Sequence, residues 1–164
     1  MTQMAKTRTA ARVESVGAEK LSGESLSRRV RRDHAMIRAL LDETERAGAA
    51  ALMRRAGGID RFRGAVWDLF IAFDDHVAME ESNVLPLLRT LDEQGGRRAM
   101  DMLAEHDEQR RVMLELVEDT ECDAKEVDAL VAQADALVLA FRDDMLVEER
   151  WLAAVVFDGG SLVS

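Results

Sequence analysis

The stretch AFDDHVAMEE at residues 72–81 returns 68 positions later as AFRDDMLVEE at residues 140–149. In each copy a histidine or an aspartate stands four residues before a glutamate: His76 with Glu80, and Asp144 with Glu148. Side chains four residues apart lie on the same face of an α-helix, so each copy can offer two ligand-type groups to one metal ion. The repeat therefore predicts two helices that each contribute half of a metal site, with Asp144 opposite His76 as the mismatch.

The composition restricts the class of protein. The chain of 164 residues is long enough for one domain with its own core. One proline, no tyrosine and a bias toward Ala, Leu, Met, Glu and Arg predict a nearly all-helical fold. The net charge of −10 disfavours nucleic-acid binding, which needs a cationic surface.

The sequence also indicates a compartment. Residues 1–22 contain no apolar run typical of a secretory signal, and no later stretch is long and apolar enough to span a membrane. The single cysteine, Cys122, cannot form an internal disulfide, which fits a reducing environment. We therefore expect a cytoplasmic protein without a membrane partner.

Apolar residues spaced by three and four predict four long helices. We expect them near residues 25–47, 60–91 and 97–118, with a fourth from about Asp123 to before Gly159. Residues 49–55 form a short connection that itself suits a helix, and the glycine pairs at 57–58 and 95–96 separate helices. Pro86 is expected to kink the second helix, because it cannot donate a hydrogen bond to the Ser82 carbonyl.

Four long helices with short connections predict an all-α fold, an antiparallel up-down-up-down four-helix bundle with a metal site in its core. Residues 23–158 are predicted to form this bundle. Residues 1–22 are predicted to be a disordered polar tail, and residues 159–164 a short C-terminal tail.

Each predicted helix carries a ligand-type side chain within its apolar stripe. The inward positions include three carboxylates and all three histidines of the chain, namely His34, His76, Glu80, His106, Asp144 and Glu148. A buried carboxylate without a partner is costly, and buried charges are normally paired or bound to metal. One such histidine is more often an ordinary core residue. Three histidines on three helices, together with the repeated carboxylate pair, instead favour a metal site over a metal-free bundle.

Four motifs carry a resemblance to a known family: Asp33-His34-x-x-Ile37-x-x-Leu40-Leu41, His76-x-x-x-Glu80-Glu81-x-x-x-Leu85-Pro86, Glu105-His106 and Glu148-Glu149. Over roughly residues 25–155 the chain resembles a hemerythrin-like, HHE cation-binding domain. The resemblance implies a non-haem di-iron centre, two iron ions joined by an oxo or hydroxo bridge. It implies that His34, His76, Glu80, His106 and Glu148 are ligands, with Glu80 and Glu148 as bridging carboxylates.

Asp144 departs from the family pattern, which has a histidine at this position. We favour ligation by Asp144, although its side chain is shorter than imidazole, so one metal must move toward the fourth helix or bind through water. The added negative charge should favour ferric iron and lower the redox potential. The alternative is that Asp144 does not bind, and that this metal is weakly held or absent.

Residues next to the ligands offer hydrogen bonds. Gln109 or Arg110 follows His106 by about one helical turn and can reach a ligand carboxylate, unless the helix turns both toward solvent. Glu81 and Glu149 are expected to form solvated pairs, or pairs beside the ligands, with arginines such as Arg150.

The leading functional hypothesis is a di-iron protein that binds or senses dioxygen, nitric oxide or peroxide through a ferrous–ferric change. Two alternatives stay open: a redox enzyme of the iron oxidase, peroxidase or oxygenase type, and an interaction module that responds to iron or redox state. No catalytic residue is assigned. Iron comes from the resemblance, since imidazole and carboxylate suit manganese and zinc as well.

Overall fold

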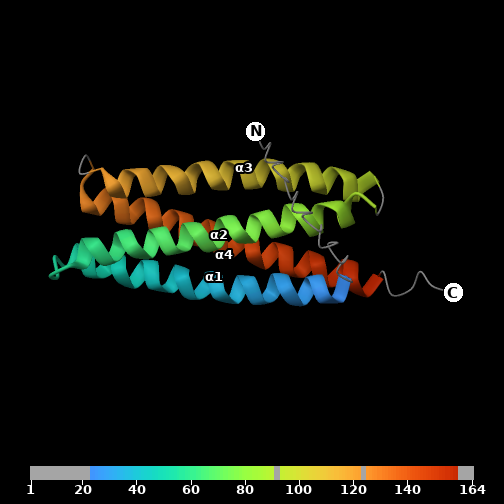
Figure 1. The fold of residues 1–164 in the computed structure, drawn as a ribbon, viewed down its shortest axis with the longest axis horizontal. Coiled ribbons are helices and arrows are strands. Elements are labelled where there is room, and N and C mark those ends of the chain that lie inside the picture. Colours follow the sequence, from blue (N-terminus) through green and yellow to red (C-terminus); the bar gives the residue numbers. More distant parts are fainter. Residues whose placement is uncertain (1–22, 91–92, 123–124, 159–164) are drawn as a thin grey trace, which may run out of the picture.

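A computed structural model describes residues 23–90, 93–122 and 125–158. It contains four helices, α1 (Gly23–Leu52), α2 (Gly58–Leu88), α3 (Glu93–Glu121) and α4 (Val127–Asp158), and within these ranges no strand. Successive helices run side by side in opposite directions (Figure 1). The predicted all-α four-helix bundle is confirmed.

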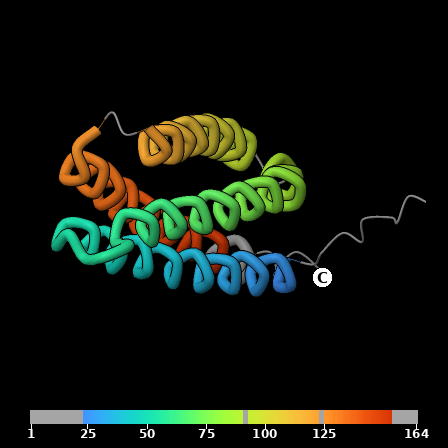
Figure 2. The backbone as a smooth tube through the Cα atoms, turned by 60° about the vertical axis from the view of Figure 1, so that its left-hand side comes forward, coloured from blue at the N-terminus to red at the C-terminus, as the bar shows by residue number. Residues whose placement is uncertain are grey.

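The helices close a ring of neighbours. α1 packs against α2 and α4, and α3 completes the ring against the same two helices. α1 and α3 therefore lie diagonally opposite, as Figure 2 also shows. The contact between α3 and α4 is the least extensive of the four interfaces. In the part of the chain that can be described, no helix has the length and hydropathy needed to cross a membrane.

The buried interior has two apolar clusters with polar residues between them. The larger cluster lies toward the α1–α2 connection and includes Ile37, Leu41, Phe62, Leu69, Met113 and Phe141. The smaller cluster lies at the other end and includes Leu26, Val30, Val84, Leu88, Met102 and Leu152. On every helix a buried histidine or glutamate separates residues of the two clusters: His34, Glu80, His106 and Glu148. These four and the adjacent His76 are called the polar layer below.

Several helix boundaries differ from the sequence-based expectation. α1 continues through Leu52, so the expected connection is helical at its start. α3 begins at Glu93, and the Gly95-Gly96 pair lies inside its first turn. The predicted break at this pair is therefore wrong. Glycine within a helix costs only about 1 kcal/mol, which packing of the remaining turns can offset.

The start of α2 is set by the local backbone conformation. Gly57 precedes α2 with a φ of 68°, a left-handed conformation that glycine adopts without strain. Pro86 lies in the last turn of α2, and the kink expected there stays a prediction. α4 begins at Val127, later than expected. The predicted tails at residues 1–22 and 159–164, and the residue pair 123–124, lie outside the described residues.

Two glycines of α2 provide a matched test of how closely its start packs on α1. A β-carbon on Gly58 would lie 2.8 Å from the Ala50 carbonyl oxygen, whereas one on Gly64 would meet nothing within 4 Å. We expect Gly58→Ala to lower the free energy of unfolding by about 1–3 kcal/mol through overpacking. Gly64→Ala should raise it by about 0.5–1 kcal/mol. Urea denaturation measures both changes, and shifts of the same sign would contradict the close contact.

Candidate metal centre

The bundle brings most of the predicted ligands into its buried interior. His34 and Glu80 are 0% and 1% exposed, and His106, His76 and Glu148 are also buried. They come from all four helices, because each stands at an inward position of an apolar stripe. Asp144 is half-buried on α4, one turn before Glu148. All six predicted residues therefore lie inside or at the edge of the polar layer.

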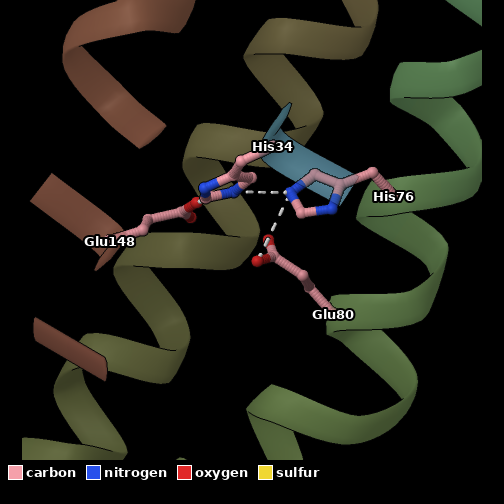
Figure 3. Close-up of side chains that lie close together, drawn as sticks. All are labelled: His34, His76, Glu80 and Glu148. Carbon is pink, nitrogen blue, oxygen red and sulfur yellow. Dashed lines mark hydrogen bonds and ion pairs between the residues drawn. The ribbon is translucent and has the colours of Figure 1, made fainter. Parts of the chain in front are cut away.

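Four of these residues converge on one point. The ligand atoms of His34, His76, Glu80 and Glu148 all lie within 4.8 Å of one another, a group that can hold a metal ion. Figure 3 shows the four side chains pointing toward one another from α1, α2 and α4. His34 Nε2 lies 3.1 Å from His76 Nε2 and 3.2 Å from Glu148 Oε2. Two imidazole nitrogens that face each other so closely, beside a carboxylate, form a donor set suited to a cation.

The polar layer also leaves atoms without hydrogen bonds. His76 Nδ1 and Glu80 Oε1 are buried, and among the residues that the structure describes neither has a hydrogen-bond partner. Glu80 Oε1 lies 3.4 Å from His76 Nε2, but this contact lacks hydrogen-bond geometry. Unpaired buried polar atoms are costly and uncommon in folded proteins. Since a cation would use the free carboxylate oxygen, the residues present fit a metal.

Glu80 faces two histidines, one with each oxygen. Its Oε1 lies 3.4 Å from His76 Nε2, and its Oε2 lies 3.3 Å from His106 Nε2. His106 is not a member of the converging group of four, which makes Glu80 its connection to that group. A carboxylate placed between two imidazoles in this way can link two metal positions.

On α1, the second ring nitrogen of His34, Nδ1, contacts an ion pair. His34 Nδ1 lies 3.0 Å from Glu149 Oε1, and Arg38 Nη2 lies 2.9 Å from the same oxygen. An imidazole that donates from Nδ1 to a carboxylate keeps its Nε2 lone pair free for a metal. The partner of Glu149 is thus Arg38 rather than the expected Arg150, which is exposed.

The α3 side repeats this arrangement. His106 Nδ1 lies 3.3 Å from Glu81 Oε1, to which Arg110 Nη1 donates at 2.7 Å. The Arg110 hydrogen bond is the main reason that the pKa of Glu81 is lowered, which keeps this carboxylate ionised as an acceptor. Sequence reasoning missed Arg38, although a signal was present: an arginine follows both His34 and His106 by four residues.

Asp144 has a different partner. The Gln109 side-chain amide donates a hydrogen bond to its carboxylate, and Asp144 is not in the converging group among the described residues. Both residues line a cavity of about 20 Å³ together with His76, Glu80, His106 and Glu148. This volume is close to the space that one water molecule needs. The contact meets the expectation that Gln109 can reach a carboxylate of the site.

Burial dominates the electrostatics of the layer. It raises the pKa of Glu80 to about 7, against the opposing hydrogen bond from His106. Burial and the charges of His34 and His106 lower the pKa of His76 to about 3. Burial also lowers the pKa of His34, but the hydrogen bonds of Glu148 and Glu149 and the charges of Glu148 and Glu80 outweigh it and raise the pKa overall. Without metal, His76 is therefore neutral near pH 7, and Glu80 keeps its proton to a higher pH than an ordinary glutamate.

The raised pKa of Glu80 gives the metal-free protein a pH dependence. The folded chain holds this proton more tightly than the unfolded chain, whose ordinary value is 4.5. The corresponding stability is complete below about pH 4.5 and is lost as the pH rises through about 7. Glu80→Gln should raise the free energy of unfolding by up to about 3 kcal/mol at pH 8 and change it little at pH 4.5.

Urea denaturation of the chelator-treated protein at the two pH values measures this difference. The exposed Glu118 on the same bundle provides a control, and Glu118→Gln should shift stability by less than about 0.5 kcal/mol at either pH. A loss of stability in Glu80→Gln at pH 8 would contradict the raised pKa.

Comparison with known proteins agrees with this geometry. Residues 25–156 match the model of the hemerythrin HHE cation binding domain, a range that contains nearly all of the four helices and the whole polar layer. Searches of curated proteins and of solved structures gave no match. The matched range covers most of the chain, and this protein belongs to the hemerythrin HHE cation-binding domain family.

Proposed function

We propose that this protein is a hemerythrin-like non-haem di-iron protein. It binds or senses dioxygen, or a related small ligand such as nitric oxide or peroxide, through a centre that changes between ferrous and ferric states. The observation that carries the proposal is the buried convergence of His34, His76, Glu80 and Glu148 in a member of a cation-binding family. Family membership favours iron over manganese or zinc, which the same ligand types also suit.

The ligands divide between two metal positions. His34 and His76, whose Nε2 atoms face each other, would hold the first position, and His106 would hold the second. Glu80 and Glu148 would link the two positions. For Glu80 this is supported by its two carboxylate oxygens, each of which faces a different histidine. Asp144 is the remaining candidate ligand at the second position.

The surroundings favour a small ligand over an organic substrate. An iron pair supplies reversible electron transfer and coordination positions for the ligand when it is bound. The cavity of about 20 Å³ has little more room than one water molecule occupies. Phe73 and Phe141, stacked with ring centroids 4.4 Å apart, line it on its apolar side. These rings exclude bulk water, while the ion pairs behind His34 and His106 keep the imidazoles oriented.

A redox enzyme is the second candidate, and one observation favours it. Asp144 makes the site richer in carboxylate than a site with a fourth histidine, and added negative charge stabilises ferric iron. Anaerobic reduction followed by exposure to oxygen separates the two functions. A reversible change in the absorption spectrum supports ligand binding, whereas rapid irreversible oxidation with repeated turnover supports an enzyme.

Metal analysis together with the absorption spectrum, recorded in air and under anaerobic conditions, tests the proposal directly. We expect about two irons per chain, as in other carboxylate-rich bundles. Removal of metal should lower the melting temperature, because a bound ion stabilises the folded chain by about 3 kcal/mol at a hundredfold excess over its dissociation constant. A purified protein without stoichiometric metal, and without a thermal shift on adding ferrous iron, would refute the proposal.

The ion pair behind His106 gives a second prediction. Glu81→Ala removes the carboxylate that holds the His106 Nδ1 proton, and should weaken metal binding roughly 10- to 100-fold. Glu108→Ala is the matched control, since Glu108 lies on the surface of α3 and pairs with Arg111 away from the layer. Competition with a chelator of known affinity measures both variants, and circular dichroism checks their helix content. Equal affinities in the two variants would show that Glu81 has no role in binding.

A further inference from the structure

The bundle has an internal two-fold repeat that can be followed residue by residue. α1 corresponds to α3 at a spacing of 72 residues, and α2 corresponds to α4 at a spacing of 68. The corresponding pairs are identical at five positions of the centre: His34 and His106, Arg38 and Arg110, Phe73 and Phe141, Glu80 and Glu148, Glu81 and Glu149. These pairs also repeat in space, as the two histidine–glutamate–arginine arrangements show.

Two cavity-lining pairs break the repeat in chemical character. Ile37 on α1 corresponds to Gln109 on α3, and His76 on α2 corresponds to Asp144 on α4. Gln109 and Asp144, the members of these two pairs on α3 and α4, contact each other. The Gln109 amide donates a hydrogen bond to the Asp144 carboxylate. The substitution of an imidazole by a carboxylate is therefore accompanied by a donor directly opposite it.

The hydrogen bond from Gln109 restricts where the Asp144 carboxylate can act. Ile37 offers no hydrogen bond, and His76 lies with its Nε2 3.1 Å from His34 and 3.4 Å from Glu80. On the other half, the carboxylate of Asp144 accepts from α3, and Asp144 is not among the described residues whose ligand atoms converge. The oxygen that accepts from Gln109 is Asp144 Oδ2. Because the side chain is shorter than imidazole, the carboxylate cannot extend as far as an imidazole toward a metal near His106 while Oδ2 stays bonded to Gln109.

We propose that Gln109 holds the Asp144 carboxylate in competition with a metal ion and thereby makes the two metal positions unequal. The position beside His34 and His76 has two imidazoles and binds tightly. The position beside His106 has one imidazole and a carboxylate engaged elsewhere, so it binds weakly and loses its metal first. Occupancy of the second position then follows the free metal concentration. The inference rests on the proposed function in one respect, that metal occupies the polar layer.

Titration of the metal-free, full-length chain with Co²⁺, followed by calorimetry and visible absorption, tests this inference. We expect two binding steps with dissociation constants that differ by about tenfold or more. Gln109→Ile places on α3 the residue that α1 has at the corresponding position. It should tighten the second step by about tenfold, because the carboxylate no longer has to give up a hydrogen bond to bind the metal, while the first step stays unchanged. Gln109→Leu is the second variant in case the β-branched side chain disturbs the helix.

Two further variants test whether release of the Asp144 carboxylate causes the tighter second binding step. Gln133→Ile makes the same chemical change on α4, where Gln133 contacts Lys125 away from the cavity, and should leave both steps unchanged. In the double variant Gln109→Ile with Asp144→Ala, the tightening of the second step should disappear, because the released carboxylate is no longer present.

The outcomes separate this inference from the proposed function. A native protein with two equal steps, or a Gln109→Ile variant whose second step weakens, would overturn the inference and leave the metal centre intact. Weakening would mean that Gln109 orients Asp144 toward the metal. A folded native chain that takes up no Co²⁺ at all would overturn both.

Discussion

The burial of ligand-type groups between two apolar clusters is the constraint on which this bundle depends. Removing carboxylates and imidazoles from water is costly unless they are paired, and His76 Nδ1 and Glu80 Oε1 have no hydrogen-bond partner within residues 23–90, 93–122 and 125–158. The two clusters position the helices, and the helices then direct the polar side chains at one another. A cation in the converging group would supply the partner that Glu80 Oε1 lacks, so metal binding and folding are expected to be linked.

The contacts that orient the histidines of the polar layer extend outward to the surface. Glu81 and Glu149 connect a buried histidine to an arginine on a helix face, so that solvated charges fix the orientation of imidazoles inside the bundle. Such outer contacts decide which ring nitrogen stays free, a requirement as strict as the identity of the ligand itself. Because this arrangement occurs on both α1 and α3, an arginine follows both His34 and His106 by four residues.

The departure from symmetry gives the centre its individual character. One half retains His76 beside His34, while the other has Asp144 hydrogen-bonded to Gln109 at the least packed helix interface. A family pattern alone would suggest two similar metal positions. The observed contacts instead support one position rich in imidazole and one whose carboxylate is hydrogen-bonded to Gln109.

The amino-acid sequence by itself determined the four helices and the inward positions of His34, His76, Glu80, His106 and Glu148, because helical periodicity fixes which residues share a face. It mistook Gly95-Gly96 for a helix break, since packing overrides a weak local preference. Only the tertiary structure decided which side chains meet between helices. Arg38 with Glu149 and Gln109 with Asp144 come from helices far apart in the chain, and their pairing depends on how the helices are rotated and packed.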